Sequence, residues 1–306
     1  MKTSLDHLPE AKRRHLARAL EILREEFEDA LAGGEADFKK KGRILKVILF
    51  GSHARGDWVD EAHTGKGYRS DYDLLVIVNN RKLTDFTRFW NNAADRLLNE
   101  RELKGIQVSF IVHSRREVNT EIKRGHGFFC DIRQQGIVLY ELDSEPLAEP
   151  QPMSVAEQLK VAQSHYENRF PHAEGFVIGA EFHWKGGRPN HAAFELHQAI
   201  EHAYSTVLLV LKNYGPPSHN LRFLRGLAED LDRRLVEAWP NDQQRFVSWF
   251  NTINEAYVKA RYSKHYQISE EALSFLVERT QVLHALVKTV CEDHLARLGE
   301  ETQDKL

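Results

Sequence analysis

The sequence changes character near its middle, and this change limits the folds that the chain can adopt. Residues 40–142 contain several runs of β-branched and apolar residues, which are typical of strands. The strand signal ends at SEPLAEPQPM, residues 144–153, which has three prolines and little to bury and is typical of a linker. Because 306 residues suffice for two ordinary domains, we expect one domain at 1–143 and another at 154–306.

The first domain is expected to mix strands with helices. An apolar stripe at spacings of three and four residues predicts a helix from about Pro9 to Leu31. Further helices are predicted at 83–100, from the third strand to about Arg124, and at 127–135. Apolar runs predict four strands, at 44–50, 73–78, 107–112 and 136–142. The second strand is apolar on both faces, so we expect it at the centre of the sheet.

The second domain is expected to be entirely helical. Ser154 and Glu157 have the spacing of a capping box, which predicts the start of a helix. A long helix is predicted at 191–215, closed by Gly215 and two prolines. Three more helical stretches follow, at 219–238, 242–260 and 269–297. The chain should therefore be an α+β protein, with a mixed α/β domain followed by an all-α bundle of about five helices.

Composition excludes several classes of function. The formal net charge of -3 gives no global basic field that would hold nucleic acid non-specifically. The two cysteines form no CxxC pair, so neither a zinc knuckle nor a redox dithiol is indicated. The first twenty residues are charged throughout, and no run of about 18 apolar residues occurs. We expect a cytoplasmic protein without a membrane partner.

Two short motifs point to phosphate and metal chemistry. The strand in ILFGSHARG stops at Gly51 and Ser52; a glycine there lets a phosphate approach the backbone, and a following helix offers N–H groups. Asp71 and Asp73 are two residues apart at the start of the next strand, so their side chains share one face. Paired carboxylates suit Mg²⁺, which is usually completed by substrate phosphates. Together the motifs predict a metal–nucleotide site.

Each motif also has an ordinary structural interpretation. A Gly-Ser pair after a strand is most often a turn, and an isolated pair of aspartates is most often solvated; it is their order on neighbouring strands that favours a site. Arg55 is a candidate phosphate ligand, or else an ion-pair partner of Asp57. Lys66 and Arg69, in the polar spacer 57–69, are candidates to close on a nucleotide, with a solvated loop as the alternative.

The combination GSHARG and SDYDLLVIV resembles the nucleotidyltransferase superfamily that includes DNA polymerase β, especially its minimal and kanamycin-nucleotidyltransferase branches. The resemblance covers roughly residues 40–143. It implies that Gly51 and Ser52 hold the triphosphate of a nucleoside triphosphate and that Asp71 and Asp73 are catalytic and hold Mg²⁺. An acceptor hydroxyl would then attack the α-phosphate, and pyrophosphate would leave.

The third strand departs from the pattern of this superfamily. Active relatives usually carry a third carboxylate there as general base, and the matching position in this chain is Ser109. We expect Ser109 on the side of the strand that faces the two aspartates. A serine hydroxyl does not take up a proton at neutral pH without help. Glu102 or Asp131 would have to replace the missing base, and nothing in the sequence places either of them there.

The second half resembles the HEPN domain, through FELHQAIEHAYSTVLLVLKNYGPPSHNLRFL together with ARYSKHY, over about residues 155–297. Arg261, Tyr262, His265 and Tyr266 cluster at a predicted helix end. Histidine as acid–base with arginine on the phosphate would suit RNA cleavage, whereas the ordinary interpretation is a structural cap. Ribonuclease members carry four to six residues between the arginine and the histidine, and this chain carries three.

Three functions therefore stay open at the level of sequence. The first is a Mg²⁺-dependent nucleotidyltransferase whose HEPN domain completes the cleft. The second is a nucleotide- or RNA-binding regulatory module with a degenerate transferase site, and the third is a HEPN ribonuclease controlled by its fused domain. The acceptor is open among a small molecule, a protein and RNA. The HEPN resemblance also implies a homodimer formed through the helical domain.

Overall fold

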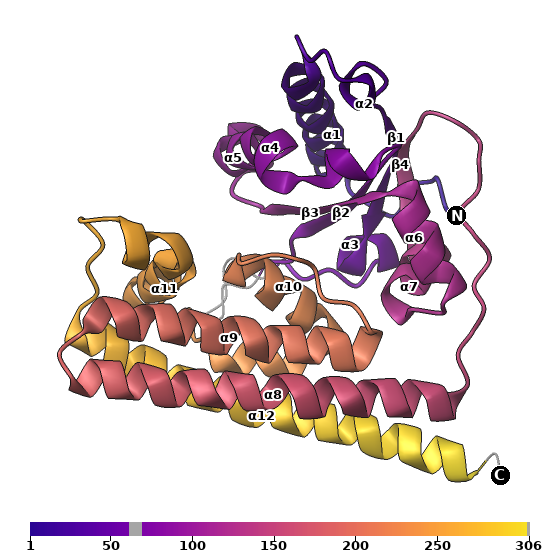
Figure 1. Cartoon of the computed structure of the whole chain (residues 1–306). Coiled ribbons are helices and arrows are strands. Elements are labelled where there is room, and N and C mark those ends of the chain that lie inside the picture. The colour runs from indigo at the N-terminus through magenta and orange to yellow at the C-terminus, as the bar shows by residue number, and fades with distance from the viewer. Residues whose placement is uncertain (61–68, 305–306) are drawn as a thin grey trace. The chain divides into compact units, whose positions relative to one another are not determined.

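The computed structural model describes residues 1–60 and 69–304 (Figure 1). The described residues divide into two compact units, with the boundary between Pro152 and Met153. Strands occur only in the first unit within the described part, and the second unit is helical. The expected α+β fold, a mixed α/β region followed by a helical bundle, is confirmed.

The first unit is built on one four-stranded sheet in the order β3-β2-β1-β4. Strand β1 pairs antiparallel with β2 and with β4, and β2 pairs parallel with β3. All residues of β1 and β2 are buried, as expected for central strands that are apolar on both faces. The strands are β1 (Ile44–Phe50), β2 (Tyr72–Val78), β3 (Val108–Ser114) and β4 (Ile137–Glu141).

Helices cover this sheet, and α1, α6 and α7 lie where the sequence predicted them. The long helix α1 buries a stripe that includes Leu16, Ile22 and Leu23 in the core of the unit. The helices of the first unit are α1 (Glu10–Leu31), α2 (Asp37–Lys40), α3 (Gly51–Arg55), the 3-10 helix η1 (Arg81–Thr84), α4 (Phe86–Phe89), α5 (Asn91–Asn99), η2 (Arg101–Leu103), α6 (Arg115–Lys123) and α7 (Gly127–Gln135).

The prediction of one continuous helix over 83–100 is wrong. The segment breaks into η1, α4 and α5, with non-helical residues at Asp85 and Trp90. The Asp85 side chain caps α4 by accepting a hydrogen bond from the Arg88 N–H. The Trp90 indole is fully buried, stacks on Phe27 at 4.8 Å and donates its N–H to the Leu83 carbonyl at 2.8 Å. These contacts bend the chain where helix propensity alone would continue it.

The second unit packs three long helices side by side, α8, α9 and α12 (Figure 1). The predicted capping box of Ser154 and Glu157 is present at the start of α8. Helix α9 ends earlier than predicted, because Asn213 adopts a left-handed conformation (φ 53°) directly after Lys212. The elements are α8 (Val155–Lys185), α9 (Pro189–Lys212), α10 (Leu221–Leu231), η3 (Arg233–Ala238), α11 (Gln244–Tyr262) and α12 (Glu270–Gln303).

Gly136 joins α7 to β4 at a point where the backbone passes close to β1. A Cβ atom at this position would lie 2.7 Å from Cγ2 of Ile48 and would overlap the carbonyl oxygen of Ile132. Neither neighbour can yield easily, because Ile48 is fully buried in the central strand and the carbonyl belongs to the helix backbone. The close approach therefore requires a glycine.

We expect Gly136→Ala to destabilise the first unit by about 1–3 kcal/mol, the usual cost of overpacking. Urea unfolding followed by circular dichroism measures this. Gln134→Ala is the matched control, because Gln134 is exposed on α7, the helix that ends just before Gly136, and it should change the free energy of unfolding by less than about 0.5 kcal/mol. Equal stability of the two variants would contradict the packing argument.

Candidate nucleotide site

The register of the sheet gathers the predicted groups at one edge. Phe50 of β1 pairs with Asp73 of β2, and Asp73 pairs on its other side with Ser109 of β3. Gly51 and Ser52 follow Phe50 directly. The loop that was predicted to hold phosphate, the carboxylate and the serine of the third strand therefore lie next to one another.

The two carboxylates share the face that was predicted for them. Tyr72 stands between them in sequence and is fully buried, whereas Asp73 is 7% exposed and Asp71 is partly exposed. Ser109 donates its hydroxyl to Oδ2 of Asp71 at 3.4 Å, and Gln107 donates an amide N–H to Ser109 at 3.1 Å. Ser109 thus lies beside the carboxylate pair, where relatives would carry a third carboxylate.

The donor set suits a hard cation such as Mg²⁺. Mg²⁺ is commonly held by one or two carboxylates and completed by water and substrate phosphates rather than by a full protein cage. Across residues 1–60 and 69–304, no group of three or more histidine, cysteine, aspartate or glutamate side chains gathers as a metal site. Asp71 and Asp73 would therefore be the protein ligands, with phosphate oxygens filling the other positions.

Gly51 lets β1 turn directly into α3. Its φ of +71° lies in the left-handed region, which costs roughly 1–2 kcal/mol for a residue with a Cβ atom. Phe50 before it is still extended, and Gly56 closes α3 with φ +96°. Ser52 on the first turn of α3 is buried. The glycines thus confine the loop to a few residues beside the carboxylates.

His53 is a residue of this site that sequence reasoning did not single out. Its Nδ1 lies 2.9 Å from the main-chain oxygen of Asp71; because a carbonyl only accepts, Nδ1–H is the donor. The ring lies parallel to that of Trp58 at 5.6 Å and close to that of Tyr72 at 4.4 Å. Burial, assisted by Lys12, lowers the pKa of His53 to about 4. A neutral imidazole therefore ties α3 to the backbone that carries Asp71.

The predicted cationic ligands have partners within the protein. Arg55 pairs with Asp57 at 3.1 Å, which is the ion pair that the sequence left as an alternative. Arg69 pairs with Asp60 at 3.0 Å and donates to the carbonyl oxygen of Lys104 at 3.2 Å. Lys66 lies outside the described residues. A role in nucleotide binding stays a prediction for all three predicted ligands.

The four residues predicted as a HEPN site are not gathered into one cluster. Arg261 donates to the Tyr257 carbonyl at 2.6 Å, and its guanidinium lies 5.0 Å from the Tyr262 ring. Tyr266 is buried and donates its hydroxyl to the carbonyl of Thr252 at 3.1 Å. His265 is exposed. Among the described residues, no hydrogen bond links Arg261 to His265.

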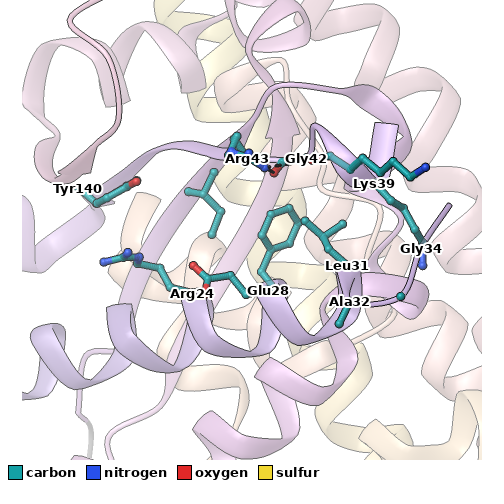
Figure 2. A pocket seen from close by; sticks show the side chains of 13 residues that line it. Arg24, Glu28, Leu31, Ala32, Gly34, Lys39, Gly42, Arg43 and Tyr140 are labelled. Atoms are coloured by element: carbon teal, nitrogen blue, oxygen red, sulfur yellow. Dashed lines mark hydrogen bonds between the residues drawn. The ribbon is translucent and has the colours of Figure 1, made fainter. Parts of the chain in front are cut away.

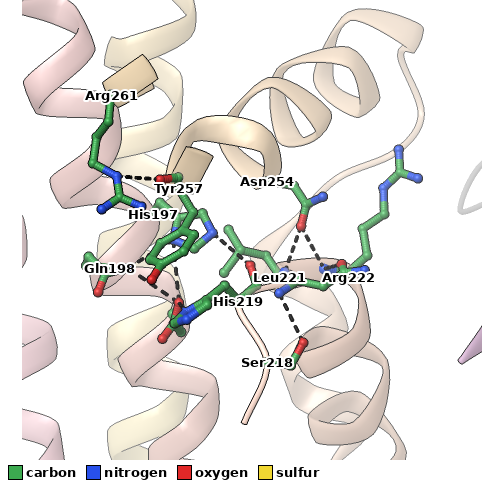
Figure 3. A network of polar contacts seen from close by, with 11 residues as sticks. His197, Gln198, Ser218, His219, Leu221, Arg222, Asn254, Tyr257 and Arg261 are labelled. Carbon is green, nitrogen blue, oxygen red and sulfur yellow. Dashed lines mark hydrogen bonds and ion pairs between the residues drawn. The ribbon is translucent and has the colours of Figure 1, made fainter. Parts of the chain in front are cut away.

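His219, rather than His265, shares an aromatic partner with Arg261, because both side chains contact the ring of Tyr257 (Figure 3). His219, just before α10, stacks on Tyr257 at 3.7 Å and donates Nδ1–H to Glu201 at 2.9 Å. The Arg261 guanidinium lies 4.4 Å from that same Tyr257 ring. His197 donates to the carbonyl of His219 at 3.0 Å, and burial lowers the pKa of His197 to about 4. Sequence spacing gave no signal for this network, because its members come from three separate segments.

Comparisons with known proteins agree with the resemblances that were predicted for the two halves of the chain. The HEPN domain family matches residues 166–290. A protein of Methanocaldococcus jannaschii named "Putative protein adenylyltransferase" is 33% identical over 115 residues, which is 38% of this chain and 92% of that protein. Its match lies in the N-terminal region. The chain therefore belongs to the nucleotidyltransferases and carries a C-terminal HEPN domain, as its motifs predicted.

The low pKa of His53 makes stability depend on pH. An unfolded histidine titrates near 6.5 and the folded one near 4, so the unfolded state binds the proton more readily between these values. Above about pH 6.5, His53 makes its full contribution to the free energy of unfolding. As the pH falls from 6.5 towards 4, this contribution is lost, and the free energy of unfolding decreases by at most about 3 kcal/mol. Unfolding free energies measured at about pH 7 and about pH 5 should show this loss.

His53→Phe keeps an aromatic ring between Trp58 and Tyr72 but removes the titrating group. This variant should lose less stability than the parent between those pH values. His197, whose pKa is also about 4, is present in both proteins and so does not affect the comparison. The same pH slope in both proteins, or a His53 proton resonance that titrates near 6.5, would show that the ring is not held neutral.

Proposed function

We propose that this protein moves a nucleoside monophosphate from a nucleoside triphosphate to an acceptor hydroxyl in a Mg²⁺-dependent reaction. The observation that carries the proposal is the row of Phe50, Asp73 and Ser109, which brings the Gly51–Ser52 loop to the carboxylate pair. The name of the Methanocaldococcus jannaschii relative supports ATP as the nucleotide and a protein hydroxyl as the acceptor. We further propose that the two compact units are the two functional domains.

Each residue of the site has a distinct role in this proposal. Asp71 and Asp73 hold the metal, which when bound neutralises charge on the phosphates. Gly51 lets the phosphate chain approach the backbone closely, and Ser52 adds a hydroxyl donor. Ser109 orients the Asp71 carboxylate through its hydrogen bond.

The proton of the acceptor hydroxyl needs a base other than Ser109. Of the two candidates, we favour Asp131. It lies on α7, and the Phe128 ring of that helix contacts Phe50 at the end of β1, with ring centroids 5.4 Å apart. Glu102 is instead exposed in η2. We therefore assign the role of base to Asp131 rather than to Glu102.

The ribonuclease alternative has less support. Arg261 is held by Tyr257, and no hydrogen bond links it to His265 within the described residues. The regulatory-module alternative differs from the transferase in one respect, since it binds the triphosphate but releases no pyrophosphate. The contribution of the helical domain to the reaction, a homodimer and a cytoplasmic location stay predictions.

Replacing both Asp71 and Asp73 by asparagine keeps their size and removes the negative charge. Calorimetry with ATP should show that Mg²⁺ tightens binding to the parent and has no such effect on the variant, because the cation has lost its ligands. Asp95→Asn, at an exposed position of the same unit, is the control and should behave like the parent. A parent that binds ATP equally well in Mg²⁺ and in EDTA would refute the metal site.

Ser109→Asp adds a third carboxylate beside Asp71. Without metal, the repulsion between the carboxylates should lower the melting temperature, and Mg²⁺ should raise it more than in the parent. Because Asp131 is proposed as the base of the parent, the added carboxylate should change turnover by much less than the roughly 10²–10⁴-fold that a general base usually contributes.

Ser109→Ala separates this effect from the loss of the serine itself. It removes the hydrogen bond to Asp71 and adds no charge, so its response to Mg²⁺ should not exceed that of the parent. Differential scanning fluorimetry with and without Mg²⁺ compares the three proteins. An identical Mg²⁺ response for Ser109→Asp and Ser109→Ala would show that position 109 does not face the metal.

A further inference from the structure

A hollow of about 520 Å³ lies beside the start of β1 (Figure 2). The carboxylates are at the other end of this strand, where Phe50 pairs with Asp73. Helix α1, the start of β1 and Tyr140 of β4 border the hollow, together with the turn around α2. Ile44 lines the hollow and Phe50 borders the nucleotide site. These residues are the two ends of β1, six residue steps apart, so the two places are about 20 Å apart. The hollow is thus a separate site within the same unit.

The floor of the hollow is apolar and its rim is basic. Phe27, Leu31 and Ile44 line it with carbon, and Phe27 and Ile44 are buried. Four cationic side chains line it as well, and Glu28 is the one carboxylate among the lining residues. In Figure 2 the Arg24 and Arg43 side chains lie on opposite sides of the hollow. The cations are Arg24, Lys39, Lys40 and Arg43.

Within residues 1–60 and 69–304, none of these four cations takes part in an ion pair. Arg24 lies over the Tyr140 ring at 5.0 Å, and Arg43 donates to the Gly42 carbonyl at 2.6 Å. Two other arginines behave differently: Arg18 of α1 pairs with Glu100, and Arg96 of α5 pairs with Glu25 of α1. The hollow therefore concentrates positive charge, whereas the cationic side chains of Arg18 and Arg96 in the same unit are neutralised by ion pairs.

We propose that this hollow binds a small organic molecule that carries a phosphate chain. Sites for small ligands typically have volumes of about 300–1,000 Å³, with apolar walls and a few polar groups that fix orientation. Arginine and lysine are the usual partners of phosphate oxygens. A nucleic acid would instead need cations spread along a track, whereas these four surround one hollow. The site is independent of the proposed transferase chemistry.

ADP without divalent metal is the probe, measured by calorimetry in EDTA. The test variant combines Lys39→Gln with Arg43→Gln, and the control combines Lys123→Gln with Lys160→Gln, which are exposed and line no part of the hollow. The test variant should bind ADP at least about tenfold more weakly than the parent, because charge-assisted hydrogen bonds are lost. The control should stay within about twofold of the parent.

A protein with asparagine at both Asp71 and Asp73 should keep this ADP binding, which separates the hollow from the nucleotide site. Equal ADP affinity in the parent and the test variant would overturn the proposal, as would an equal loss in the control. A short single-stranded RNA is the final comparison. If the test variant loses affinity for RNA but keeps that for ADP, the basic surface is a nucleic-acid face and the proposal is wrong.

Discussion

Asp73 is flanked by Phe50 on one neighbouring strand and by Ser109 on the other, and the position of every candidate group depends on this alignment. A shift of one residue in the pairing register of β2 would turn Asp71 and Asp73 towards the face of the sheet on which Tyr72 now lies. The apolar residues of β1 and β2, which are buried along their whole length, oppose such a shift. Core packing therefore holds the carboxylates beside the Gly51 loop.

Local sequence was sufficient wherever the decisive interaction is local. Gly51 and Asp73 were predicted correctly at strand ends because apolar runs and a glycine mark those ends directly. The break at Trp90 was missed, because its cause is an indole buried against a distant helix. His53 and His219 were missed for the same reason: each acts through partners from other segments, Asp71 in one case and Glu201 in the other. Periodicity carries no information on such contacts.

The small net charge of the chain conceals an uneven distribution within the first unit. One end of β1 adjoins Asp71 and Asp73, whereas the other end adjoins the basic hollow with Arg24 and Arg43. Without a metal ion, the two carboxylates would repel phosphate, whereas a cation bound between them would attract it. The basic side chains of the hollow attract phosphate directly. Phosphate binding at one end of β1 would thus depend on a metal ion, and phosphate binding at the other end would not.

A crystal structure of the protein with Mg²⁺ and a non-hydrolysable ATP analogue would show whether the two aspartates hold a metal ion beside the Gly51 loop. We predict a cation between the carboxylates of Asp71 and Asp73, with the phosphate chain lying along Gly51 and Ser52. A triphosphate bound elsewhere, with no metal at the two aspartates, would contradict this prediction.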